Sequence, residues 1–222
     1  MRNLSFSEKE FYHIYNRGVD KRPIFLEKDD LERFCECMEI LNREKPINSF
    51  RDLPRHPVSG KPELAESPKL VKFVAYCLNP NHFHLILEQV AEKGIEKFMH
   101  KWEMGHSKYI NAKYKRSGAL FQGKFKAIYI DSNEYLLHVS AYVNLNNQVH
   151  GYGGEALTKS SWSEYLSSQS IPGLCEKNII LEQFEDKYKY KQFAESTLLD
   201  VVERKKSIKE LEDDGIELVN TR

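Results

Sequence analysis

The sequence predicts an α+β fold: a ferredoxin-like or RRM-like antiparallel sheet with packed helices, followed by a helical C-terminal tail. Three observations support this. Strand-like and helix-like runs follow one another in the order β-α-β-β-α-β-α, a short turn joins the two central strand-like runs, and 41% of the 222 residues are hydrophobic. A chain of this length and composition can bury one sizeable core.

The first part of the chain predicts a strand, a helix and a long loop. Phe11 to Asn16 is rich in aromatic and β-favouring residues and is expected to form a strand that stops at the following Arg-Gly pair. Asp29 to Arg43 carries apolar residues at helical spacing. Pro46 to Pro68 contains five prolines, which favours an extended loop or insertion that is long for a compact domain.

The central segment predicts a β-hairpin. Lys69 to Leu78 and His82 to Glu88 both consist largely of β-favouring apolar residues, and only Asn79-Pro80-Asn81 separates them. Since a turn this short joins antiparallel neighbours, the two runs are expected to pair directly.

The rest of the chain predicts three helices and one strand. Ile95 to Lys115 has helical spacing, and Phe125 to Ile130 favours a strand. The next helix is expected from Ser132, a suitable N-cap, to Asn146. A further helical segment spans Leu181 to about Leu211. We therefore divide the chain into a domain over residues 1–170, with residues 46–69 as a proline-rich insertion or loop, and a helical extension over residues 171–222.

Charge is balanced overall but segregated along the chain. The 33 basic and 33 acidic residues cancel, which argues against a uniformly basic nucleic-acid binder. Residues 93 to 130, however, include nine basic and two acidic residues, a net charge of +7. Phosphate contacts are expected there. The four cysteines lack metal-ligand spacing and no apolar run approaches 18 residues. We therefore expect free thiols in a cytoplasmic protein that has no membrane segment.

The most informative motif is the pair His82 and His84 in the second strand of the predicted hairpin. Because side chains alternate along a strand, both imidazoles point to one face, about 7 Å apart, while Phe83 points to the other. Two imidazoles in this arrangement can hold one divalent cation and leave positions open for a phosphate. The alternative is that both are ordinary half-buried residues of the sheet.

Tyr142 and Asn146 lie four residues apart on one side of the predicted last helix of the domain. If that helix packs beside the histidine strand, Asn146 can supply a third ligand oxygen and Tyr142 a nucleophilic oxygen. A tyrosine that attacks a phosphodiester forms a covalent phosphotyrosine and conserves the bond energy for rejoining. The alternative is a core tyrosine followed by an asparagine at a helix end.

Four segments in this order, FYHIYNRGVDKRPIF, CLNPNHFHLILEQ, GALFQGKFKAIYIDSNEYLLHVSAYVNLN and SSWSEY, resemble the single-tyrosine HUH transposases. The resemblance covers about Glu10 to Leu166 and is greatest to the REP-associated branch, which acts on palindromic repeat DNA. Two departures stand out. Asn79 occupies a position where the family usually has methionine, and Asn147 to His150 replaces the usual Pro-Val-Arg-Ala.

The resemblance implies a metal-dependent enzyme that nicks and rejoins single-stranded, hairpin-bearing DNA through a 5′-phosphotyrosine. It implies Mg²⁺ or Mn²⁺ held by His82, His84 and Asn146, with Tyr142 as the nucleophile. Among the relatives, both dimers with exchanged helices and self-contained monomers occur, so a homodimer is possible.

Five residues are candidate DNA contacts. Arg17 follows the first strand, and the resemblance implies a phosphate contact there; a solvated turn arginine is the alternative. Lys124 and Lys126 alternate with an aromatic residue as an exposed face would, and Arg116 belongs to the same basic stretch. Phe121 is a candidate for stacking on an unpaired base, with a place in the core as the alternative.

Three other functions stay open at this stage. A domesticated relative would hold hairpin DNA without cutting it, an RRM-like protein would bind RNA through exposed aromatic residues, and a metallophosphatase would hydrolyse phosphodiesters without an adduct.

Overall fold

The computed structural model describes residues 4–45, 67–167 and 173–213 of the chain. The strands are β1 (Phe11–Arg17), β2 (Val71–Asn79), β3 (His82–Gln89), β4 (Lys126–Ile130) and β5 (Lys159–Ser160). The helices are η1 (Val19–Lys21), α1 (Lys28–Ile40), α3 (Gly94–Lys113), α4 (Asn133–Asn144), α5 (Asn146–Val149), α6 (Trp162–Leu166), α7 (Asn178–Leu181) and α8 (Lys187–Asp213).

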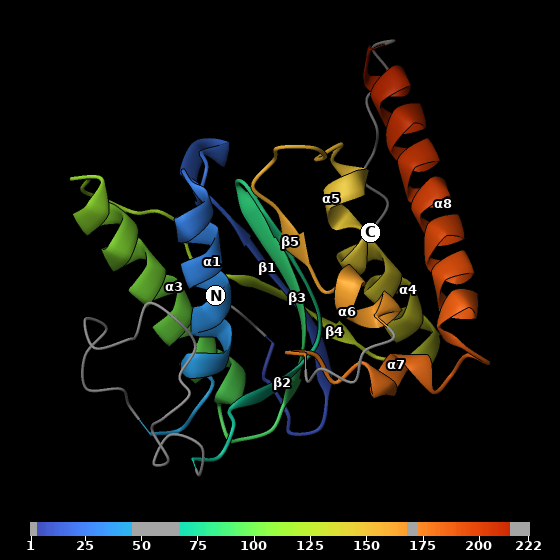
Figure 1. Ribbon diagram of the computed structural model, residues 1–222, viewed down its shortest axis with the longest axis horizontal. Helices are drawn as coiled ribbons and strands as arrows, with labels where there is room; N and C mark the ends of the chain where they lie inside the picture. The colour runs from blue at the N-terminus through green and yellow to red at the C-terminus, as the bar shows by residue number, and fades with distance from the viewer. Residues whose placement is uncertain (1–3, 46–66, 168–172, 214–222) are drawn as a thin grey trace.

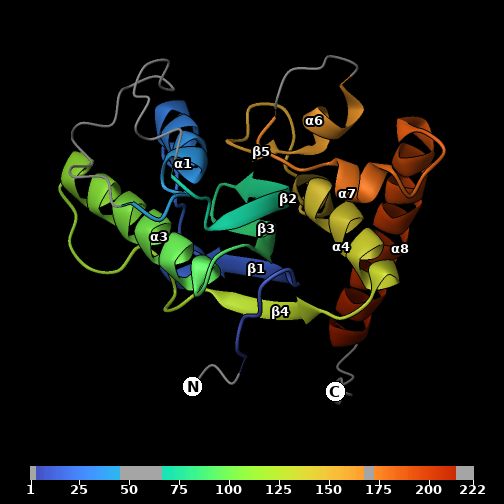
Figure 2. The ribbon, with the colours of Figure 1, turned by 90° about the horizontal axis from the view of Figure 1, so that it is seen from below.

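The strands form one antiparallel sheet in the order β4-β1-β3-β2-β5, with α1 and α3 on one face and α4 and α8 on the other (Figures 1 and 2). This confirms the predicted α+β fold. The sequence did not predict β5, since two residues are too few to show a strand period.

The predicted hairpin is present, with Pro80 and Asn81 as its two-residue turn. β3 is the central strand of the sheet, so its side chains meet residues of both β1 and β2. The partners across the sheet are Arg17 and Asn79 for His82, and Tyr15 and Cys77 for His84.

The core between the sheet and its first helical layer is aromatic. Phe83 of β3, Phe34 of α1 and Trp102 of α3 are completely buried. The rings of Phe34 and Trp102 stack with centroids 3.8 Å apart, and the Trp102 indole N–H donates to the Phe34 carbonyl at 2.9 Å. These contacts hold α1 and α3 against the face of β3 opposite His82 and His84.

α1 ends at Ile40, three residues before the predicted end of that helix. Asn42 is buried just after it, where its amide accepts from the backbone N–H groups of Leu70 and Val71 and donates to the Val71 carbonyl. The hydrogen bonds of Asn42 to the start of β2 therefore take the place of a further helical turn. The predicted proline-rich loop falls mostly on residues 46–66, outside the described part of the chain.

The helical extension packs on α4, which carries Tyr142 (Figure 2). The buried Tyr190 hydroxyl of α8 accepts from the Asn144 amide at 2.8 Å and lies 3.1 Å from the Ser140 hydroxyl. Ser161 donates to the other end of the Asn144 amide at 2.6 Å. α8 and the SSWSEY segment thus fix α4 on the sheet. Within the described ranges, no helix has the length and apolar character needed to cross a membrane.

His106 of α3 is expected to make folding stability depend on pH. Burial lowers the pKa of this ring from 6.5 to about 4, and its Nε2 donates to the Ile24 carbonyl. In the unfolded chain His106 takes up a proton near pH 6.5, whereas in the folded chain the ring stays neutral until about pH 4. The contribution of His106 to the free energy of unfolding is therefore fully present above pH 6.5 and is lost as the pH falls towards 4.

Lowering the pH from 7 to 5 is expected to reduce the free energy of unfolding by about 2 kcal/mol through His106. Denaturant titrations at both pH values check it. His106→Gln keeps an N–H for Ile24 but does not titrate, so its stability should change less with pH by about that amount. An equal pH dependence in both proteins contradicts the expectation.

Candidate active site

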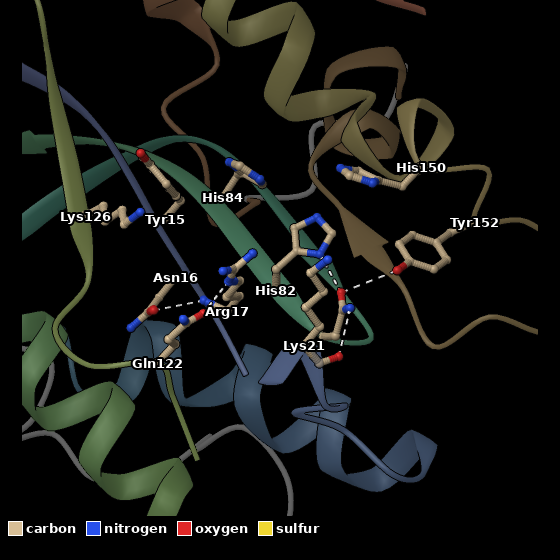
Figure 3. A pocket seen from close by; sticks show the side chains of 11 residues that line it. Tyr15, Asn16, Arg17, Lys21, His82, His84, Gln122, Lys126, His150 and Tyr152 are labelled. Atoms are coloured by element: carbon tan, nitrogen blue, oxygen red, sulfur yellow. Dashed lines mark hydrogen bonds between the residues drawn. The ribbon is translucent and has the colours of Figure 1, made fainter. Parts of the chain in front are cut away.

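A cavity of about 560 Å³ opens over His82 and His84 on the side of the sheet that α4 covers (Figure 3). β1, β3, the turn between β2 and β3, and the segments after α3 and α5 all contribute to it. The lining residues are Tyr15, Asn16, Arg17, Lys21, Asn81, His82, His84, Gln122, Lys126, His150 and Tyr152.

The cavity is electropositive. Arg17, Lys21 and Lys126 line it, and none of its described lining residues carries a carboxylate. Gln122 accepts a hydrogen bond from the Arg17 guanidinium, and the Lys126 ammonium lies 5.9 Å from the centre of the Tyr15 ring. Such a lining favours an anionic ligand such as a phosphate.

The hydrogen bonds of Asn81 determine which nitrogen of His82 carries the proton. The Asn81 amide nitrogen donates to the Lys21 carbonyl at 3.1 Å, so its oxygen faces the Nδ1 atom of His82 at 2.6 Å. That oxygen can only accept, so Nδ1 carries the hydrogen and the Nε2 atom of His82 presents a lone pair.

The side chain of Asn146 places a second acceptor atom next to the Nε2 atom of His82. Its side-chain oxygen lies 3.1 Å from Nε2 of His82, and the Asn79 amide nitrogen donates to both atoms, at 2.8 Å to the oxygen and 3.0 Å to the ring nitrogen. Asn79 and Asn146 are completely buried. Two acceptors this close are stabilised by a positive group between them.

The donor set fits a divalent cation. Adjacent ligands around an octahedral Mg²⁺ lie about 3 Å apart, which matches the separation of Nε2 and the Asn146 oxygen. No group of three His, Cys, Asp or Glu residues able to hold a metal occurs in the part of the chain that the structure describes. An ion bound here by two imidazoles and a neutral amide would therefore keep most of its charge for a phosphate ligand.

Tyr142 lies beside the histidine pair. Its ring centre is 5.5 Å from that of His84, at an interplanar angle of 84°. Burial raises the pKa of the phenol, and a polar contact with the Asn146 side chain opposes the rise. At neutral pH the phenol is therefore protonated.

The predicted single helix through Tyr142 and Asn146 is in fact two. α4 ends at Asn144, Leu145 leaves helical geometry (φ −107°, ψ 12°), and α5 begins at Asn146. The break explains the departure from the prediction: Asn146 turns towards Asn79 and His82 instead of continuing the face of α4.

The predicted DNA contacts divide into two groups. Arg17 and Lys126 line the cavity, whereas the exposed Lys124 and the half-buried Arg116 do not. Phe121 takes the alternative place in the core: the residue is 6% exposed, and its ring packs near Phe34, Phe83 and His106.

The basic stretch between residues 93 and 130 is also not one surface around the cavity. Much of it lies on α3, on the opposite face of the sheet (Figure 2). Lys113 there pairs with Asp30 at 2.8 Å and with Glu27 at 3.1 Å, and Lys101 donates to the Arg43 carbonyl. The positive cavity instead combines residues from distant parts of the sequence.

Three residues that contact His82 or His84 were not predicted as site residues from the sequence: Asn79, Asn81 and His13. Asn79 ends β2 and Asn81 lies in the turn before His82, and a polar pair in an otherwise apolar hairpin was a usable signal. His13 of β1 lies against His84, with its Nε2 atom 2.8 Å from Nδ1 of His84. Burial lowers the pKa of His13 to about 4, so it is neutral. Its place beside the site depends on strand register, which local sequence does not show.

Residues 63–146, which contain His82, His84, Tyr142 and Asn146, match the family model described as IS200-like transposase. This segment of the chain is therefore similar to the IS200-like transposases.

Among solved structures, the chain is similar to a REP-associated tyrosine transposase bound to a REP hairpin. The two chains are 12% identical, with a TM-score of 0.48 over 78% of this chain and 88% of the other. A comparison with curated proteins finds no match.

Proposed function

We propose that this protein is a metal-dependent enzyme that nicks and rejoins hairpin-bearing, single-stranded DNA through a 5′-phosphotyrosine at Tyr142. The observation that carries the proposal is the convergence of a phenol, two imidazoles and an amide oxygen beside a positive cavity. A hydrolytic metallophosphatase has no need of a phenol at this place.

His82, His84 and Asn146 would hold the divalent cation, Mg²⁺ or Mn²⁺. When bound, the ion neutralises charge on the non-bridging phosphate oxygens. The hydroxyl oxygen of Tyr142 attacks the phosphorus and loses its proton. The new Tyr–O–P bond replaces the P–O3′ bond, and the released 3′ oxygen takes up a proton. The reverse attack by a 3′-hydroxyl rejoins the strand.

Arg17, Lys21 and Lys126 would position the flanking phosphates in the cavity, while unpaired bases supply specificity. Tyr142 and His84 of one chain lie together, so we infer that a single chain can assemble the site. The homodimer that the family resemblance allows is not needed for this arrangement.

A polarity assay tests the proposal. The protein is incubated with Mn²⁺ and hairpin oligonucleotides labelled at either end, followed by denaturing electrophoresis. We expect only the 3′-terminal label to move with the protein, and the released 5′ fragment to be extended by a DNA polymerase, since it ends in a 3′-hydroxyl. Adduct formation with the opposite label, or cleavage that forms no adduct, contradicts the proposal.

Lys126→Ala is expected to weaken hairpin binding and to reduce the slope of log K against log salt by about 1, because one phosphate contact is lost. Fluorescence anisotropy at several salt concentrations measures both. Lys108→Ala is the matched control, since Lys108 is exposed on α3 across the sheet. Equal slopes for both variants would contradict the assignment of Lys126 as a DNA contact.

A further inference from the structure

His13 and His84 form a buried imidazole pair on neighbouring strands. Nε2 of His13 lies 2.8 Å from Nδ1 of His84, and the rings stack with centroids 5.1 Å apart. His13 is 7% exposed and His84 is 9% exposed. Two ring nitrogens 2.8 Å apart have room for one hydrogen between them, and either ring can carry it.

The position of this hydrogen decides what His84 can bind. With the hydrogen on Nδ1 of His84, Nε2 of the same ring has a lone pair for a cation. With the hydrogen on His13, neutral His84 carries its own hydrogen on Nε2 and cannot ligate there.

His82 offers a direct parallel within the same site. Its Nδ1–H donates to Asn81, which leaves Nε2 as the acceptor that meets Asn146. Both candidate ligands are thus contacted through Nδ1 by a neighbouring side chain. Metal-binding histidines characteristically donate their second N–H to such a partner, which sets the tautomer and the ring orientation.

We propose that His13 is a positioning residue of the metal site: it accepts the Nδ1–H of His84 and so presents Nε2 of that ring to the divalent cation. The inference rests on the proposed function, because it requires His84 to be a metal ligand. His13 itself touches neither the cation nor DNA.

The experiment measures Mn²⁺ affinity and the His84 tautomer in the full chain. Mn²⁺ titrations follow the paramagnetic broadening of β3 amide signals, and nitrogen-15 imidazole spectra with Mg²⁺ report which His84 nitrogen carries the hydrogen. We expect His13→Phe to weaken Mn²⁺ binding by about 10–100-fold. His13→Gln supplies an amide oxygen that can accept the Nδ1–H, and it should recover most of that loss.

Tyr12→Phe is the control for loosening of β1, because it changes the adjacent position on the other face of the strand and should leave Mn²⁺ affinity within about twofold. Wild-type spectra with Mg²⁺ should show His84 protonated on Nδ1. This measurement does not depend on the folding of any variant.

Three outcomes overturn the inference alone: His84 protonated on Nε2 with Mg²⁺ bound, unchanged affinity in His13→Phe, or equal losses in His13→Phe and His13→Gln. A wild-type protein that binds no Mn²⁺ overturns the metal site itself, and the inference with it.

Discussion

Replacing Tyr142 with phenylalanine is expected to abolish the covalent protein–DNA adduct and to slow nicking by at least about 10⁴-fold. The ring that packs near His84 remains, while the oxygen that attacks phosphorus is lost. The hydroxyl is not in the set of atoms proposed to hold the cation or the flanking phosphates. Mn²⁺ binding and hairpin binding should therefore stay within about threefold of the wild-type values, as truncating one polar group costs little beyond its own contact.

The matched control is Tyr135→Phe, which removes a phenol two turns earlier on the same helix. It should form the adduct at the wild-type rate, as quantified on denaturing gels. An adduct that persists in Tyr142→Phe would assign the nucleophile to another residue. Hairpin binding by a wild-type protein that never forms an adduct would instead support the domesticated DNA-binding alternative.

His82→Ala is expected to produce the second large effect, a loss of metal-dependent cleavage by about 10²–10⁴-fold, since a bound ion supplies several kcal/mol of transition-state stabilisation. The substitution removes the lone pair that faces the Asn146 oxygen. It also leaves the Asn79 amide without one of its acceptors, which costs about 1–3 kcal/mol of stability. Cleavage rates across a Mn²⁺ titration measure the first effect, and urea unfolding measures the second.

His100→Ala serves as the control for removing an imidazole, since His100 is exposed on α3 behind the opposite face of the sheet. Its Mn²⁺ dependence should match that of the wild type. If His82→Ala remains folded and still cuts with the wild-type Mn²⁺ dependence, the assignment of His82 as a ligand is wrong.

The segment that matches the family model and the residues of the candidate site overlap only in part. The family model matches a continuous stretch of sequence, whereas the site joins that stretch to residues well outside it, including His13, Arg17 and Tyr152. A mutational study confined to the matched segment would miss the β1 residues that line the cavity or contact His84.

Some features followed from the sequence alone. The order of strands and helices, the hairpin at Pro80 and Asn81, and the shared face of His82 and His84 all depend on local periods and turn chemistry, which neighbouring residues determine. Spacing and family resemblance together predicted a site made of His82, His84, Tyr142 and Asn146.

Other features were decided only by the tertiary structure. The FQGKFK stretch has the same alternation whether Phe121 is exposed or buried, and only packing against Phe34 and Phe83 decides between them. The contact between the Nδ1 atom of His84 and His13 exists only because β1 pairs with β3 in this register. Local periodicity determines which side of an element a residue faces. What it meets there depends on register and packing between segments far apart in the chain, and short-range sequence patterns carry no record of either.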